Sequence, residues 1–287
     1  MMNETIALGR EALRAALDVR RKGDVAVSNP VCVYDLAESL GVEVKFVAVN
    51  SLGGMFAKTS NTILVPSLRP PGRRAFTCAH ELGHWYFGHG DRIDELTVGE
   101  ADCNSPREEQ LADLFASHLL MPKWAVIAAL SQREWDAHHL AVHQAYILAC
   151  QLGVGYETIL RHMWRTLHLI SKAQAEALMK KTPKQIRRAT IGTDTPDHLI
   201  IADRAWNTVP IDLQVGEKVL VPGPITSDCA QLAVVTALDS EVLLEALNPG
   251  ITRIATADGT WSAFVRISRR EFCGRSIYRH LEDSDVD

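Results

Sequence analysis

The 287-residue sequence lacks the features of several large protein classes. No apolar run approaches the ~20 residues that span a bilayer, so no membrane segment is predicted. The first residues show no basic segment followed by an apolar one, so secretion is not expected. The six cysteines form no Cys-x-x-Cys pair, which predicts reduced thiols and a cytoplasmic location rather than a disulfide framework.

Internal repeats and low-complexity tracts are also missing, and the composition is that of a globular protein, with 47% hydrophobic and 23% charged residues. The length allows two domains, each with its own core. A net charge of −5 conceals an uneven distribution. Residues 160–188 are strongly basic, whereas the chain ends in an acidic stretch.

Hydrophobic periodicity predicts a mixture of helices and strands, with a mainly β-like region from about residue 190 onward. In chain order, we predict helices at 4–21 and 31–40, a strand at 42–49, a hairpin of 54–58 and 62–66, a helix at 76–87 after a Pro-Pro-Gly breaker, a loop at 90–106, a helix at 107–121, further helices to about 179, and mainly strands from about 190.

The helix predicted at 76–87 carries a motif with metal chemistry. His80 and His84 are four residues apart, about 40° around a helix, so both imidazoles reach one ion. Glu81 is rotated about 100° from His80, where its carboxylate suits a general base rather than a ligand. Chance produces such a short pattern in unrelated chains, but the uninterrupted helical window around it favours a zinc site.

A catalytic zinc needs a third protein ligand. The metzincin pattern, with Gly three residues and His six residues after the second histidine, is absent, because Phe87 and Gly90 occupy those positions. His89 lies about 140° from His84 around a continued helix, so we predict that it is not a ligand. A carboxylate at the start of the helix at 107–121 is the better candidate, which leaves Glu108 and Glu109.

These segments together resemble the ImmA/IrrE family of zinc metallo-endopeptidases. The His-Glu-x-x-His helix is followed at 109–122 by Glu-Gln-Leu-Ala-Asp-Leu-Phe-Ala-Ser-His-Leu-Leu-Met-Pro, which is similar to the family's second motif. Residues 41–45, the short hairpin and residues 152–161 are similar too, although Gly155 replaces the family's Ser. The resemblance covers roughly residues 10–170.

The resemblance implies that Glu109 is the third ligand, with Glu108 as the fallback, and that Zn²⁺ is the cofactor, with Mn²⁺ as a substitute. It implies an α+β fold, with a zincin-like metallopeptidase domain at residues 1–125 and a helical, winged-helix-like region at 126–188. A β-rich domain at 189–287 is predicted to be a GAF-like sensor, on a weaker likeness without a motif. We expect a fragment ending near residue 188 to hold the whole metal site.

Two further residues receive site hypotheses. Cys103 lies in the loop between the two ligand helices, where its thiolate can take the fourth zinc position and keep the enzyme latent; the alternative is an ordinary reduced cysteine. Tyr156 is the first candidate for oxyanion stabilisation, ahead of Arg161 and His162, and the alternative for each is a structural role. The histidines at 138, 139 and 143 are interpreted as a solvated helix face.

The basic stretch suggests nucleic acid as a partner. We predict contacts from Lys180, Lys181, Arg187 and Arg188, with single-stranded DNA as an activator; the alternative is a solvated helix face.

The leading functional hypothesis is a cytoplasmic endopeptidase that cleaves a helix-turn-helix transcriptional repressor after DNA damage or phage infection, in stress response or antiviral defence. The hairpin at 54–66 is expected to offer a free strand edge to an extended substrate. The alternative is a non-catalytic regulator that binds DNA or a protein partner and uses zinc structurally. Glu81 favours catalysis, because a structural site has no use for an acid there. A housekeeping peptidase of broad specificity is a third option.

Overall fold

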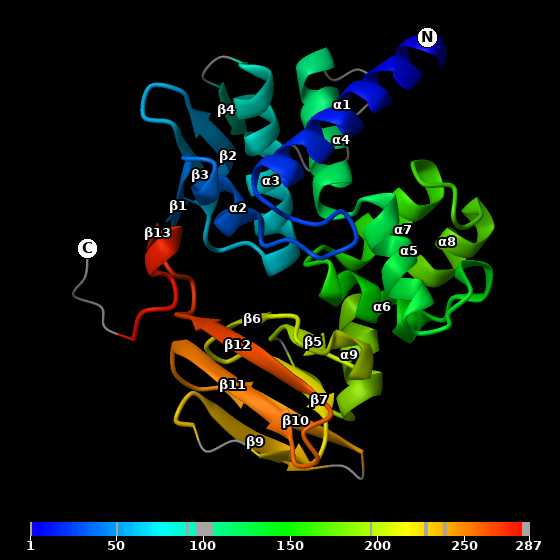
Figure 1. Ribbon diagram of the computed structural model, residues 1–287, viewed down its shortest axis with the longest axis vertical. Coiled ribbons are helices and arrows are strands. Elements are labelled where there is room, and N and C mark those ends of the chain that lie inside the picture. The colour runs from blue at the N-terminus through cyan, green and yellow to red at the C-terminus, as the bar shows by residue number, and fades with distance from the viewer. Residues whose placement is uncertain are drawn as a thin grey trace. The chain divides into compact units, whose positions relative to one another are not determined.

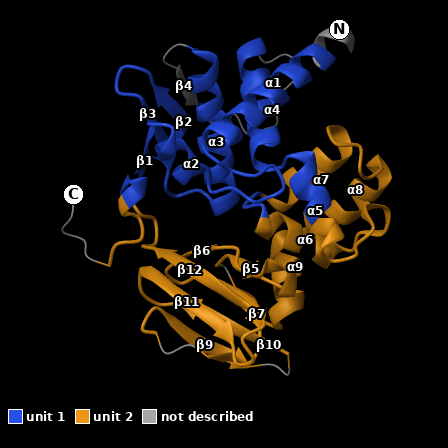
Figure 2. Cartoon of the chain, in the orientation of Figure 1, with its two compact units in different colours: residues 1–128, 152–154, 273–277 blue, residues 129–151, 155–272, 278–287 orange. Residues whose placement is uncertain are grey.

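The computed structural model describes residues 2–49, 51–89, 92–95, 106–195, 197–226, 229–237 and 240–282. They form two compact units (Figure 2). The first comprises residues 1–128, 152–154 and 273–277, and the second comprises residues 129–151, 155–272 and 278–287. Each unit contains helices and strands, so the predicted α+β class is confirmed. The domain division predicted after residues 125 and 188 stays a prediction.

A five-stranded sheet forms the base of the first unit, in the order β13-β1-β3-β2-β4 (Figure 1). β1 and β3 are parallel, and the other neighbours are antiparallel. The strands are β1 (Glu43–Val47), β2 (Leu52–Ala57), β3 (Thr62–Pro66), β4 (Arg92–Glu95) and β13 (Gly274–Arg275). The helices are α1 (Met2–Lys22), α2 (Val33–Ser39), α3 (Pro71–Phe87), α4 (Arg107–Leu120) and most of α5 (Lys123–Ser131).

The predicted hairpin is present as β2 and β3, paired antiparallel. Two other predictions are wrong. Residues 92–95, inside the predicted loop, form strand β4 on the outer side of β2, so the hairpin does not have a free edge there. The long helix includes part of the Pro-Pro-Gly breaker, because Pro71 at its first position needs no backbone N–H partner.

Helix α3 packs on strands β2 and β3 and against helix α4. Gly83 lets the two helices approach closely: a Cβ built there would lie 3.2 Å from the Cα of Ala112 and 3.0 Å from the ring of Phe115. The inward side of α3 is closed by residues such as Cys78, Ala79 and Leu82, which are fully buried. The ligand helices are therefore held by a tight core rather than by loops.

The fifth strand of this sheet comes from the far end of the chain. β13 pairs antiparallel with β1, with Lys45 opposite Arg275. The Arg275 guanidinium lies 3.2 Å from the Glu43 carboxylate. The buried Ser276 hydroxyl donates to Glu38 at 2.7 Å. Residues 273–277 thus belong to the first unit although more than a hundred residues of the second precede them.

The second unit combines a helical part with two four-stranded sheets, in the orders β5-β7-β10-β9 and β6-β12-β11-β8. Its helices are η1 (Ala137–His139), α6 (Val142–Gln151), α7 (Tyr156–Arg165), α8 (Lys172–Met179), α9 (Pro183–Ile191) and η2 (Arg204–Trp206). Its strands are β5 (Leu199–Ile201), β6 (Ile211–Gln214), β7 (Lys218–Pro222), β8 (Ile225–Thr226), β9 (Leu232–Ala237), β10 (Glu241–Ala246), β11 (Gly250–Thr256) and β12 (Ser262–Ser268).

One apolar core joins the two sheets of the second unit, and it includes the buried indoles of Trp206 and Trp261. Trp261 donates its ring N–H to the carbonyl of Asp203 at 3.1 Å, so this large side chain is buried without losing its hydrogen bond. The helices and strands predicted for this part of the chain are largely present. The GAF-like assignment of residues 189–287 is not confirmed.

One segment, Arg107–Ser131, is long and apolar enough to cross a membrane. This is weak evidence for a membrane span, because buried core helices of water-soluble proteins share that length and composition. In this chain 61% of the apolar window is buried within the protein.

Candidate metal centre

Helix α3 places His80 and His84 on one face, as their spacing predicts. Their Nε2 atoms lie 3.0 Å apart. Both residues are buried, His84 to 2% exposure. Two imidazole nitrogens so close together in a buried site repel if both are protonated, and if both rings carry their proton on Nδ1 the two Nε2 lone pairs converge on one point. This geometry is typical of two ligands that share a cation.

Glu109, in the first turn of α4, supplies the third donor. Its Oε2 lies 3.2 Å from Nε2 of His80 and 3.6 Å from Nε2 of His84. Tetrahedral ligands at about 2.0–2.2 Å from a zinc ion lie about 3.3–3.5 Å from one another. The three measured separations, 3.0, 3.2 and 3.6 Å, lie on either side of that range, within about 0.3 Å of it. Among the described residues, these three form the one group of histidines, cysteines and acids with metal-ligand spacing.

The histidines also set the charge state of Glu109. Contact with the imidazoles of His80 and His84 holds the pKa of this carboxyl well below its usual range. The residue is therefore a carboxylate at neutral pH, which is the form that binds a cation. The structure thus brings Glu109 to the two histidines and does not group Glu108 with them.

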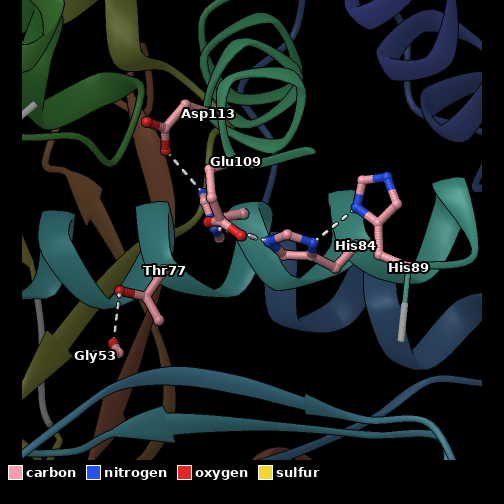
Figure 3. Close-up of polar contacts among 7 residues, drawn as sticks. Gly53, Thr77, His84, His89, Glu109 and Asp113 are labelled. Carbon is pink, nitrogen blue, oxygen red and sulfur yellow. Dashed lines mark hydrogen bonds and ion pairs between the residues drawn. The ribbon is translucent and has the colours of Figure 1, made fainter. Parts of the chain in front are cut away.

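Asp113 is a site residue that the sequence analysis missed. It lies one turn after Glu109 on α4, and its Oδ1 lies 2.8 Å from Nδ1 of His80. With Nε2 of His80 turned to the cluster, Nδ1 carries the proton and donates it to the carboxylate (Figure 3). Such a contact fixes the ring and its tautomer. The i, i+4 spacing of Glu109 and Asp113 places both acids on one face of the helix, and this spacing was the signal in the sequence that could have identified Asp113.

A second contact of this kind involves His84. Its Nδ1 lies 2.8 Å from Nδ1 of His89, on the side of the ring away from Glu109 (Figure 3). His89 is outside the ligand group, as predicted, but not for the predicted reason. Helix α3 ends at Phe87, so His89 is not on a continued helix.

Glu81 occupies a close-fitting space between α3 and strand β2. The side chain is buried to 2% exposure. A Cβ at Gly54 of β2 would overlap the Oε1 atom of Glu81 and would lie 2.6 Å from Cγ2 of Thr77. The Thr77 hydroxyl donates to the carbonyl of Gly53 at 3.4 Å, which links the same helix face to the strand (Figure 3). A glycine at position 54 therefore makes room for the acid.

The Tyr156 hydroxyl is hydrogen-bonded within its own unit. It is buried in the second unit and donates to the carbonyl of Leu178 at 3.0 Å. Burial raises the pKa of this phenol to about 12. The oxyanion role of Tyr156 stays a prediction. The alternative candidate His162 is likewise buried in the second unit.

The remaining predicted residues fall into two groups. Cys103 and most of the loop at 90–106 lie outside the described residues. Of the predicted nucleic-acid contacts, Lys180, Lys181 and Arg188 are exposed, whereas Arg187 is half-buried and hydrogen-bonds the buried hydroxyl of Tyr146. Nucleic-acid binding stays a prediction, and the structure leaves three of its four cations accessible.

Comparison with known proteins places this cluster in a recognised domain. Residues 35–163 match the family model of the IrrE N-terminal-like domain, peptidase M78. The radiation response metalloprotease IrrE of Deinococcus radiodurans is 34% identical over 95 residues, which cover 32% of this chain and 29% of that protein. The chain thus matches less than a third of that relative's length.

A Mycobacterium tuberculosis transcriptional regulator of known structure aligns with 54% of this chain and 46% of its own, at 16% identity and a TM-score of 0.37. A likeness this low carries no argument about function.

Proposed function

Because residues 35–163 belong to the ImmA/IrrE family, we propose that this chain is a zinc-dependent endopeptidase with His80, His84 and Glu109 as its metal ligands. One observation carries the proposal: a buried acid, Glu81, lies next to the ligand pair on α3, and Gly54 makes room for it. A metal site that served only folding would not need this acid.

The donor set supports zinc. Two imidazole nitrogens and one carboxylate oxygen form a mixed set that suits zinc, and three protein ligands leave a fourth position open, as catalytic sites require. Mn²⁺ is the proposed substitute, since carboxylate and imidazole also bind it. A zinc ion held by these three residues would supply Lewis-acid activation of the scissile carbonyl and of the attacking water.

The chain's own residues then supply the proton chemistry. The Glu81 carboxylate accepts a proton from the attacking water and delivers it to the nitrogen of the departing amine. Its burial on a rigid helix holds it in place for both transfers. Asp113 orients the imidazole of His80 through Nδ1, so that Nε2 faces the proposed metal position.

The proposed substrate is a helix-turn-helix repressor, cleaved after DNA damage or phage infection, a proposal that comes from the family resemblance. An extended substrate segment needs a strand edge. Since β4 covers β2, we place the segment on β4, which pairs with β2 alone among the described residues. The β-rich part of the second unit is the proposed regulatory region.

The decisive test compares Glu81→Gln with Glu108→Gln. Bound zinc is measured by metal analysis, and cleavage is measured on labelled casein and on a candidate helix-turn-helix repressor. We expect one zinc per chain in both variants. Cleavage by Glu81→Gln falls by roughly 10³-fold, as loss of a general base predicts, while Glu108→Gln cleaves like the wild type.

Equal cleavage by Glu81→Gln and the wild type contradicts the mechanism. Zinc binding by a wild type that cuts neither substrate, with or without single-stranded DNA, favours the alternative of a non-catalytic regulator with structural zinc.

A further inference from the structure

The end of helix α3 brings His89 back over the ligand His84. Gly88 takes the left-handed conformation, with φ of 69°, and stops the helix. The backbone N–H of His89 then donates to the carbonyl of His84 at 3.0 Å. This turn reverses the chain within two residues and sets the imidazole of His89 against that of His84, with ring centroids 5.0 Å apart.

The proton inventory of the pair leaves one arrangement. A neutral imidazole has one N–H and one lone pair. When Nε2 of His84 gives its lone pair to the cation, its proton must lie on Nδ1, and Nδ1 of His89 is 2.8 Å away. His89 must then accept through Nδ1 and keep its own proton on Nε2.

We propose that His89 is a positioning residue of the metal site: its Nδ1 accepts the proton of His84 Nδ1 and thereby fixes the ring and tautomer of that ligand. The inference rests on the proposed metal site. His80 has a carboxylate, Asp113, in the equivalent place, at the same 2.8 Å. The two ligand histidines are thus oriented by different chemistry, one by an anion and the other by a neutral ring.

The surroundings of His89 support a fixed ring. Phe87 stacks on it with centroids 5.7 Å apart and planes at 23°. Phe87 in turn meets the ring of Phe115 on α4 edge-on, at 6.0 Å. Helix α4 also carries Glu109 and Asp113. The same helix pair therefore holds the third ligand and the aromatic support of His89.

Three proteins test this role: wild type, His89→Asn and His89→Phe. The Asn side chain places an amide oxygen near the position of Nδ1 and can accept the same hydrogen bond. Phe keeps the ring and its stacking but has no acceptor. Zinc affinity is measured by competition with a chromophoric chelator, and the melting temperature of the metal-free protein reports packing.

We expect His89→Phe to bind zinc 10- to 100-fold more weakly, the usual effect of losing an orienting contact to a ligand. His89→Asn should stay within a few-fold of the wild type, with similar metal-free melting temperatures for all three. Wild-type affinity in His89→Phe, or an equal loss in both variants, overturns the proposal. If the wild type binds no zinc, the proposed metal site itself is wrong. That result is distinguishable from failure of the positioning role of His89, in which the wild type binds zinc.

Discussion

The two units of this chain bury different kinds of side chain. In the first unit, two histidines and an acid lie in the interior of a helix pair, each within reach of another polar group. The core between the two sheets of the second unit is apolar, and the described residues of that unit contain no group with metal-ligand spacing. Burying polar groups costs free energy unless they are paired, so the cluster of the first unit carries a cost that the apolar core between the two sheets does not. Such a cost indicates a function at that place.

The largest expected effect concerns zinc binding by the polar cluster of the first unit. Glu109→Ala removes one of three protein ligands, so zinc affinity should fall more than about 100-fold, beyond the effect of losing an orienting contact. Glu108→Ala is the matched control on the preceding residue and should bind as the wild type does. Both are measured by chelator competition. If Glu108→Ala loses zinc and Glu109→Ala does not, the third ligand is misassigned by one residue.

A smaller effect compares the acid response of the two units. Burial lowers the pKa of His118 in the first unit and of His280 in the second, each to about 4. In the unfolded chain a histidine has a pKa of about 6.5. The unfolded state therefore binds the extra proton between these values, and stability is lost as pH falls from about 6.5 towards 4. At pH 5 each site should cost about 2 kcal/mol.

The measurement is the urea unfolding free energy at pH 7 and pH 5 for wild type, His118→Leu and His280→Leu. Each substitution should reduce the pH dependence by about 2 kcal/mol. If the two units unfold independently, each variant changes only the unfolding transition of the unit that contains the substitution. If the units unfold together, both variants change one shared unfolding transition. If the unfolding free energy of both variants depends on pH as strongly as that of the wild type, the burial of these histidines is contradicted.

The smallest effect uses two buried serines, eight residues apart, that belong to different units. Ser276 donates to Glu38 in the first unit, and Ser268 donates to the carbonyl of Leu213 in the second. Ser276→Ala should cost about 1.5 kcal/mol, the value of a hydrogen bond to a charged group. Hydrogen exchange should quicken in β1. Ser268→Ala should leave the rate of hydrogen exchange in β1 unchanged. Faster exchange in β1 of this variant would contradict the division of the chain into two units.

The part of the site that was predictable from sequence depends on local geometry. His80, Glu81 and His84 lie within five residues on one helix, so the helical period alone places them. Glu109 needed a family resemblance, because spacing left Glu108 equally eligible. The contact of Asp113 with His80 depends on how helices α3 and α4 pack, and the contact of His89 with His84 depends on where helix α3 ends. The helical period of a single segment predicts neither contact.

The strands show the same limit. The hairpin of β2 and β3 was predictable, because its partners are neighbours in sequence. Strand β4 is four residues long and follows a helix after a short gap, so periodicity has too few residues to detect it. The pairing of β1 with β13 joins residues separated by most of the chain, and no local signal marks it.

That last pairing fixes when the first unit can be completed during synthesis. Domains usually fold in order as they leave the ribosome, at about 5–20 residues per second. This one cannot finish its sheet when residue 128 emerges, because β13 is translated only after nearly all of the second unit. A fragment ending near residue 188 would carry all three proposed ligands but lack a strand of the sheet. A polypeptide that ends before residue 274 therefore lacks one strand of this sheet, and the sheet is completed only after residues 129–272 have been translated.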